Sequence, residues 1–141
     1  MELMIVIVII GILSAVGMVM FGGQSEKAKI AVAKSNHKSA TKYIKIEVMK
    51  CDLGETSVME GNLNCSSVTG VNIAKAAVAA LADFKNPYNN AEKAVGTGTD
   101  VGLVNVSASG NTITVVTCYE EVGDPAACTA DTKLTNEVEV E

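Results

Sequence analysis

Residues 1–21 read MELMIVIVIIGILSAVGMVMF, and this apolar run decides how the rest of the chain folds. No residue between Leu3 and Ser25 carries a charge. At a rise of about 1.5 Å per residue, one helix of this length crosses the ~30 Å hydrocarbon core of a lipid bilayer. Glu2 is the exception, because a carboxylate costs about 2.5–3.5 kcal/mol at the centre of a membrane helix. An acid at the edge of such a run indicates a partner or a role.

The apolar run continues into an amphipathic segment. From Gln24 to Cys51 the chain contains neither Pro nor Gly, so we expect a helix of about 50 residues, far above the usual length. At about 100° per residue, one narrow stripe of this segment is predicted to be buried. Its members are Ile30, Ala33, His37, Ala40, Ile44, Val48 and Cys51. Another apolar face holds Val32, Tyr43 and Ile46, which predicts packing on more than one side.

A third face of the same segment is basic. It collects Lys27, Lys34, Lys38, Lys42 and Lys45. The formal charge is +4 over residues 1–50, from seven Lys and three acids, and −9 over residues 51–141, from four Lys and thirteen acids. Three interpretations of the lysine face stay open: a solvated surface, contact with the acidic domain of an adjacent copy, or binding of DNA. The absence of Arg argues against a nucleic-acid surface built on bidentate guanidinium contacts.

The four cysteines predict two disulfides outside the cytoplasm. None of them lies in a Cys-x-x-Cys pair, and the chain has one His, so a zinc site is disfavoured. Three pairings are possible. We favour the local one, Cys51–Cys65 with Cys118–Cys128, because each bond closes a short loop and contributes about 3 kcal/mol in the chain-entropy model.

The acid followed by Leu-Met-Ile-Val-Ile-Val-Ile-Ile-Gly-Ile-Leu-Ser-Ala, then an amphipathic helix and a small domain with a late cysteine pair, resembles a type IV pilin. The resemblance implies an α+β fold in which a long N-terminal helix packs on a small antiparallel sheet. It also implies that three residues, the first of them methylated, and a leader peptide precede the position of Met1. Such subunits wait in the cytoplasmic membrane and are then stacked by an assembly machine into an extracellular filament.

Within that resemblance, Glu2 neutralises the N-terminal amine of a neighbouring copy in the apolar filament core and fixes its register. Glycines interrupt the helix, and each weakens a helix interior by up to about 1 kcal/mol relative to Ala. They are Gly11, Gly17, Gly22 and Gly23. We therefore expect the helix to loosen between Gly11 and Gly23 when the filament forms.

After Cys51 the chain predicts a loop and then strands. Residues 52–70 read as a loop held by Cys65, and Asn72 is expected to cap a short helix, residues 73–84. The β-branched segments 101–107 and 112–119 flank Ser109-Gly110-Asn111, which indicates an antiparallel hairpin. Val104 and Val106 with Ile113 and Val115 are expected to face the buried stripe. Residues 134–141 are either another strand or an acidic tail.

No catalytic constellation is evident, and we predict neither an enzyme nor a bound cofactor. His37 lies on the buried stripe and is predicted to be a packed or hydrogen-bonded core residue rather than a base. Glu120, Glu121 and Asp124, near Asp131, offer oxygen ligands of the kind that Ca²⁺ prefers. Their spacing matches no calcium loop, so no metal is predicted.

These observations divide the chain into a hydrophobic N-terminal helix, residues 1–23, and a globular domain, residues 24–141. The domain comprises an amphipathic helix (24–51), a loop with a short helix (52–100), and antiparallel strands with a disulfide-bounded region (101–141). The expected function is a structural subunit of a pilus used for adhesion, twitching motility or DNA uptake. Two alternatives stay open: a major pseudopilin of type II secretion, and a membrane-tethered binding module that never polymerises.

Overall fold

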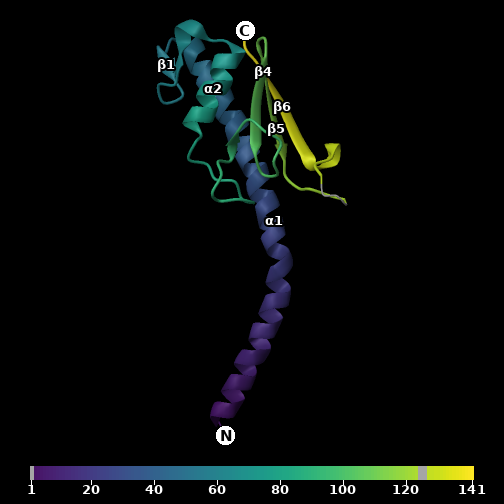
Figure 1. Cartoon of the computed structure of the whole chain (residues 1–141). Coiled ribbons are helices and arrows are strands. Elements are labelled where there is room, and N and C mark those ends of the chain that lie inside the picture. The colour runs from purple at the N-terminus through teal and green to yellow at the C-terminus, as the bar shows by residue number, and fades with distance from the viewer. Residues whose placement is uncertain (1, 124–126) are drawn as a thin grey trace.

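One helix dominates the computed structural model, which describes residues 2–123 and 127–141, with residues 2 and 18–22 described by their backbone alone. This helix, α1, runs over Glu2–Asp52. Figure 1 shows the C-terminal half of α1 lying within a small α+β domain, while the N-terminal half projects from one end of it. The start of α1 and the C-terminus lie at opposite ends of the molecule (Figure 1).

A four-stranded sheet covers one side of the C-terminal half of α1. Its order is β3 (Val95–Gly96), β4 (Val104–Ser109), β5 (Thr112–Cys118) and β6 (Lys133–Glu139). β3 pairs with β4 in parallel, and the other pairs are antiparallel. The predicted hairpin is present, with Ser109 opposite Thr112 across the turn. The C-terminal segment forms the edge strand β6, so the alternative of a trailing acidic tail is wrong.

The predicted first strand begins later than expected. Strand β4 starts at Val104 rather than at Val101, because Gly102 adopts φ +80° in a turn. The carbonyl of Val101 accepts a hydrogen bond from Nδ2 of Asn86 at 2.9 Å. A side chain in the preceding loop therefore holds Val101 away from the sheet ladder.

The segment between α1 and the sheet contains more structure than a loop. Its elements are β1 (Ser57–Val58), paired with β2 (Leu63–Asn64), then the 3₁₀ turn η1 (Cys65–Ser67) and the helix α2 (Gly70–Ala80). Another 3₁₀ turn, η2 (Ala130–Thr132), leads into β6.

The prediction that Asn72 caps this helix is wrong. Thr69 is the N-cap: its backbone is extended, and Oγ1 accepts a hydrogen bond from the Asn72 amide at 3.3 Å. Asn72 instead donates through Nδ2 to the Ser67 carbonyl at 2.9 Å. The helix also ends at Ala80 rather than at residue 84, because the chain turns there and the Phe84 amide bonds back to Leu81. Threonine and asparagine are both favoured at the N-cap, so residue type alone could not predict which of Thr69 and Asn72 caps the helix.

The core lies between α1, α2 and the inner face of the sheet. Val104, Val106, Ile113 and Val115 are almost fully buried, as the alternation predicted. Of the predicted stripe on α1, Ala33, His37, Ala40, Ile44 and Val48 are buried, and Ile30 and Cys51 at its two ends are partly exposed. Thr41 and Glu47 are buried beside the stripe, although the periodicity assigned them to no buried face.

Candidate assembly surfaces

The first candidate surface is the apolar half of α1, which nothing in the chain covers over the described residues. Leu3 is 80% exposed and Ile9 is 51% exposed. Eleven large apolar side chains in this half are exposed: Leu3, Met4, Ile5, Val6, Ile7, Val8, Ile9, Ile10, Ile12, Leu13 and Val16. They occupy all sides of the helix, so this half has no polar face to present to water.

The predicted membrane span is not found in the part of the chain described with side chains. Over the residues described with side chains, no helix is long and apolar enough to cross a membrane. The predicted run includes residues 18–22, whose side chains lie outside that description.

Two of the predicted assembly features are described only by their backbone. Glu2 and Gly22 are helical, but their side-chain environments lie outside the described part. Gly11, Gly17 and Gly23 are also helical, and a Cβ added to any of them would meet no atom within 4 Å. Within the single chain, a larger side chain would therefore fit at these three positions without a steric clash.

His37 fixes the position of α1 on the sheet. Its side chain is 1% exposed, and both ring nitrogens are hydrogen-bonded. Nε2 lies 2.7 Å from Oδ1 of Asn136 on β6, and Nδ1 lies 2.9 Å from Oγ1 of Thr117 on β5. Burial lowers the pKa of His37 below its ordinary value of 6.5, although the hydrogen bond with Asn136 opposes this shift. The prediction of a hydrogen-bonded core histidine is confirmed.

Glu47 joins α1 to the β1–β2 hairpin. The residue is 6% exposed, and Oε2 of its carboxylate accepts a hydrogen bond of 2.6 Å from the Met59 amide. Oε1 accepts a hydrogen bond from Nζ of Lys50. Burial raises the pKa of Glu47, but the hydrogen bonds from Lys50 and Met59 outweigh burial and hold the pKa below its usual value. Met59 and Glu60 both have positive φ, 54° and 59°, a backbone conformation that residues other than glycine rarely adopt. The Glu47 carboxylate therefore stabilises a turn whose backbone conformation is unfavourable for the two residues that form it.

The lysine face lies on α1 beside the sheet. Lys27, Lys38, Lys42 and Lys45 are exposed, whereas Lys34 is partly buried. Nζ of Lys34 lies 4.1 Å from the ring centroid of Tyr119, a cation–π distance. Lys34 therefore has a partner within its own chain and is not counted with the four exposed lysines as part of a free charged surface.

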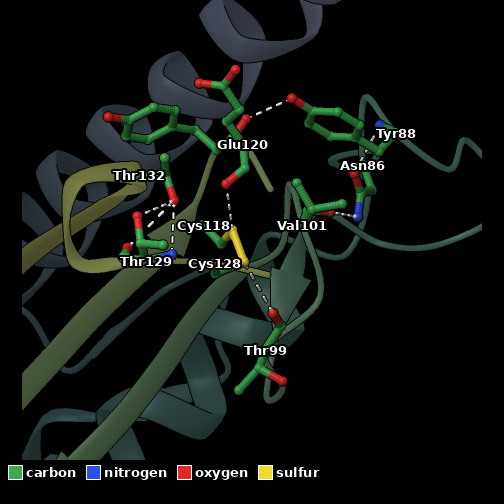
Figure 2. The surroundings of a disulfide bond; sticks show 10 residues. Asn86, Tyr88, Thr99, Val101, Cys118, Glu120, Cys128, Thr129 and Thr132 are labelled. Carbon is green, nitrogen blue, oxygen red and sulfur yellow. Dashed lines mark hydrogen bonds between the residues drawn. A yellow bond between two sulfur atoms is a disulfide. The ribbon is translucent and has the colours of Figure 1, made fainter. Parts of the chain in front are cut away.

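Both disulfides have the predicted local pairing, Cys51–Cys65 and Cys118–Cys128. The first ties the end of α1 to the segment after β2. The second closes the region after β5, where Figure 2 shows Tyr88 reaching toward it from the loop that carries Asn86. The Tyr88 hydroxyl donates to the Tyr119 carbonyl at 2.5 Å. Burial, reinforced by Glu26, Glu120 and Glu121, raises the pKa of Tyr88, so this hydroxyl keeps its proton.

No metal centre is formed by the residues that the structure describes. In residues 2–123 and 127–141, no group of three His, Cys, Asp or Glu side chains is placed to hold an ion. Asp124, one of the four acids of the calcium alternative, lies outside these ranges.

A scan of protein-family models found no match to this chain, and searches of curated proteins and of solved structures also found no match. The assignment of function therefore rests on the sequence and on the surfaces described above.

Proposed function

We propose that this chain is a structural subunit of an extracellular helical filament of the type IV pilin kind, with a pilin fold. The observation that carries the proposal is the apolar half of α1, whose side chains are exposed on all sides. Burying one Val, Leu, Ile or Met side chain contributes about 1.5–3 kcal/mol. Eleven such side chains on one projecting helix therefore need a cover that the chain itself does not provide.

Copies of the same helix supply that cover in a filament. A contact between two different surfaces of one chain, repeated without closing into a ring, produces a helical polymer. In this proposal the apolar halves form the filament core, and the α+β domains form its outer layer. Before assembly, the apolar half is held in the lipid of the cytoplasmic membrane, and the assembly machinery transfers it into the filament.

Glu2 and the glycines have roles within this proposal. An acid next to the apolar core pairs with the N-terminal amine of a neighbouring copy, which offsets the cost of burying both charges and sets the register between copies. The glycines between Gly11 and Gly23 allow α1 to loosen on assembly, because glycine weakens a helix interior.

Electron microscopy of material sheared from cells tests the proposal. Cells that express the chain should release long fibres of uniform diameter, and mass spectrometry should identify this chain as their main component. The matched control is Leu3→Lys with Val8→Lys, which places two charges on the exposed apolar surface and leaves the domain unchanged. The control should remain cell-associated and yield no fibres. Absence of fibres at high expression of the unchanged chain would overturn the proposal in favour of a pseudopilin or a tethered binding module.

A further inference from the structure

Two pairs of like charges face solvent on different elements of the domain. The lysine pair, Lys38 and Lys42, lies on α1, and the acidic pair, Glu137 and Glu139, lies on the edge strand β6. All four side chains are exposed. Over the described residues, the ion pairs that the structure shows are Lys29–Glu26 and Lys50–Glu47, both within α1. Neither pair of like charges is therefore neutralised within its own chain.

The geometry of β6 explains why the acidic pair does not reach the lysine pair of the same chain. Asn136 bonds to His37 on α1, and Val138 is buried, so even-numbered residues of β6 face the helix. Side chains alternate along a strand, so Glu137 and Glu139 point to the opposite face of the sheet. There they lie opposite Thr114 and Thr112 of β5. Lys45 of α1 lines a surface pocket together with Glu137 and Glu139, but the ion pairs of the described residues do not include Lys45.

The two pairs match each other in spacing as well as in sign. Residues four apart on a helix, such as Lys38 and Lys42, are separated by about 6 Å along the axis and lie on neighbouring parts of one face. Residues two apart on a strand, such as Glu137 and Glu139, are separated by about 6.7 Å and share a face. Two parallel ion pairs can therefore form between an α1 helix and the outer face of a sheet from another molecule.

We propose that the acidic pair of one copy docks on the lysine pair of a second copy in the assembled filament. This inference rests on the proposed filament function, and it names the surfaces of the domain through which copies contact one another. The contact joins two different surfaces of one chain, as an open helical polymer requires. Because the pairs lie at the surface, they set the orientation and rate of assembly and are screened by salt.

Charge reversal with rescue tests this inference in cells that express the full chain. Lys38→Glu with Lys42→Glu, or Glu137→Lys with Glu139→Lys, should lower the mass of sheared fibres by about tenfold or more, because like charges then face each other. The variant that combines all four reversals should recover at least about half of the fibre mass, since the complementarity is restored. Lys75→Glu with Lys93→Glu is the control for the lysine reversal, because both residues are exposed on other parts of the domain and the change in net charge is the same as in Lys38→Glu with Lys42→Glu. Its fibre mass should stay within about twofold of the unchanged chain.

Cross-linking gives a second measurement that does not depend on assembly yield. A carbodiimide that joins amines to carboxylates without a spacer should link Lys38 or Lys42 to Glu137 or Glu139 in fibres. In fibres grown from a mixture of isotope-labelled and unlabelled copies, the linked peptides should include mixed-label species. The detergent-solubilised single chain should give none of these links.

The possible outcomes separate this inference from the proposed function. Normal fibres from both reversal variants, or failure of the combined variant to recover, would overturn the docking contact and leave the filament intact as a proposal. Loss of DNA binding in the lysine variant with unchanged fibre mass would also overturn it, and would assign the lysine face to nucleic acid. Absence of fibres from the unchanged chain would overturn both.

Discussion

Nε2 of His37 lies 2.7 Å from Oδ1 of Asn136, a contact that ties α1 to the edge strand of the sheet. An amide oxygen only accepts hydrogen bonds, so Nε2 carries the proton and Nδ1 accepts from the hydroxyl of Thr117. Thr117 is fully buried. The imidazole therefore satisfies two polar groups from neighbouring strands, and it fixes how far α1 is rotated and shifted on the sheet.

Removal of this imidazole should destabilise the domain. His37→Leu leaves the Thr117 hydroxyl without its partner and should lower the free energy of unfolding by about 1–3 kcal/mol. Denaturant unfolding of the detergent-solubilised full chain measures the change. Asn136→Ala should cost less in the His37→Leu background than in the unchanged chain, with a coupling of about 0.5–3 kcal/mol. Additive effects of the two substitutions would show that the contact contributes no stability.

The lowered pKa of His37 predicts a loss of stability on mild acidification. Below pH 6.5 the unfolded chain binds a proton at His37 that the folded chain resists binding, so the free energy of unfolding falls as the pH is lowered toward the folded pKa. The slope is at most about 1.4 kcal/mol per pH unit. His37 is the one histidine of the chain, so His37→Gln should remove the slope between about pH 7.5 and 5.5. Parallel pH profiles for the two proteins would contradict this prediction.

Glu47 should contribute more to the free energy of unfolding than an exposed surface acid does. Glu47→Ala leaves the amide of Met59, a fully buried residue, without its acceptor, and should cost about 1–3 kcal/mol. Glu55→Ala is the matched control, because Glu55 is exposed, and it should change stability by less than about 0.5 kcal/mol. Hydrogen exchange of the Met59 amide gives a local measurement and should accelerate in Glu47→Ala. Equal stabilities for the two variants would show that the β1–β2 hairpin does not need this carboxylate.

Alanine substitutions at Gly102 and Gly54 distinguish the cost of backbone strain from the cost of steric overlap. Both have positive φ, +80° and +99°, so an alanine at either position costs about 1–2 kcal/mol in backbone strain. At Gly54 the added Cβ meets no atom within 4 Å, whereas at Gly102 it would overlap Oδ1 of Asn86. That oxygen accepts the Tyr88 amide at 2.9 Å. Gly102→Ala should therefore cost at least about 1 kcal/mol more than Gly54→Ala in thermal unfolding, and equal costs would exclude the overlap.

The glycines of the apolar half make a prediction about the filament rather than the single chain. Gly11→Ala with Gly17→Ala should leave the domain folded, because neither Cβ meets a neighbour, and should stabilise α1 by up to about 1 kcal/mol per site. If α1 loosens on assembly, this variant should form fewer fibres. An image reconstruction of fibres in which helical hydrogen bonding continues from Gly11 to Gly23 would contradict the loosening.

Much of the domain follows from residue periodicity. The stripe from Ala33 to Val48 could be predicted because a helix brings every third or fourth residue to one face, whatever partner that face meets. The hairpin around Gly110 could be predicted because β-branched residues alternate on both sides of a turn sequence. The sequence could not predict whether strand β6 forms, since alternating Glu and Val is compatible with both an edge strand and a solvated tail. The strand depends on pairing with β5, which is distant in the sequence.

The sequence by itself determined the apolar half of α1, its placement at one end of the chain and the burial of His37, because these depend only on composition and helical spacing. Tertiary structure decided which groups bond to His37, that Glu47 is buried on an amide of the β1–β2 hairpin, and that Thr69 rather than Asn72 caps α2. Each of these depends on the direction of a hydrogen bond between segments, and direction is set only when the chain is packed. Tertiary structure also decided that Glu137 and Glu139 lie on the face of β6 opposite to the buried Val138, since a strand's two faces are assigned only when one of them meets the core.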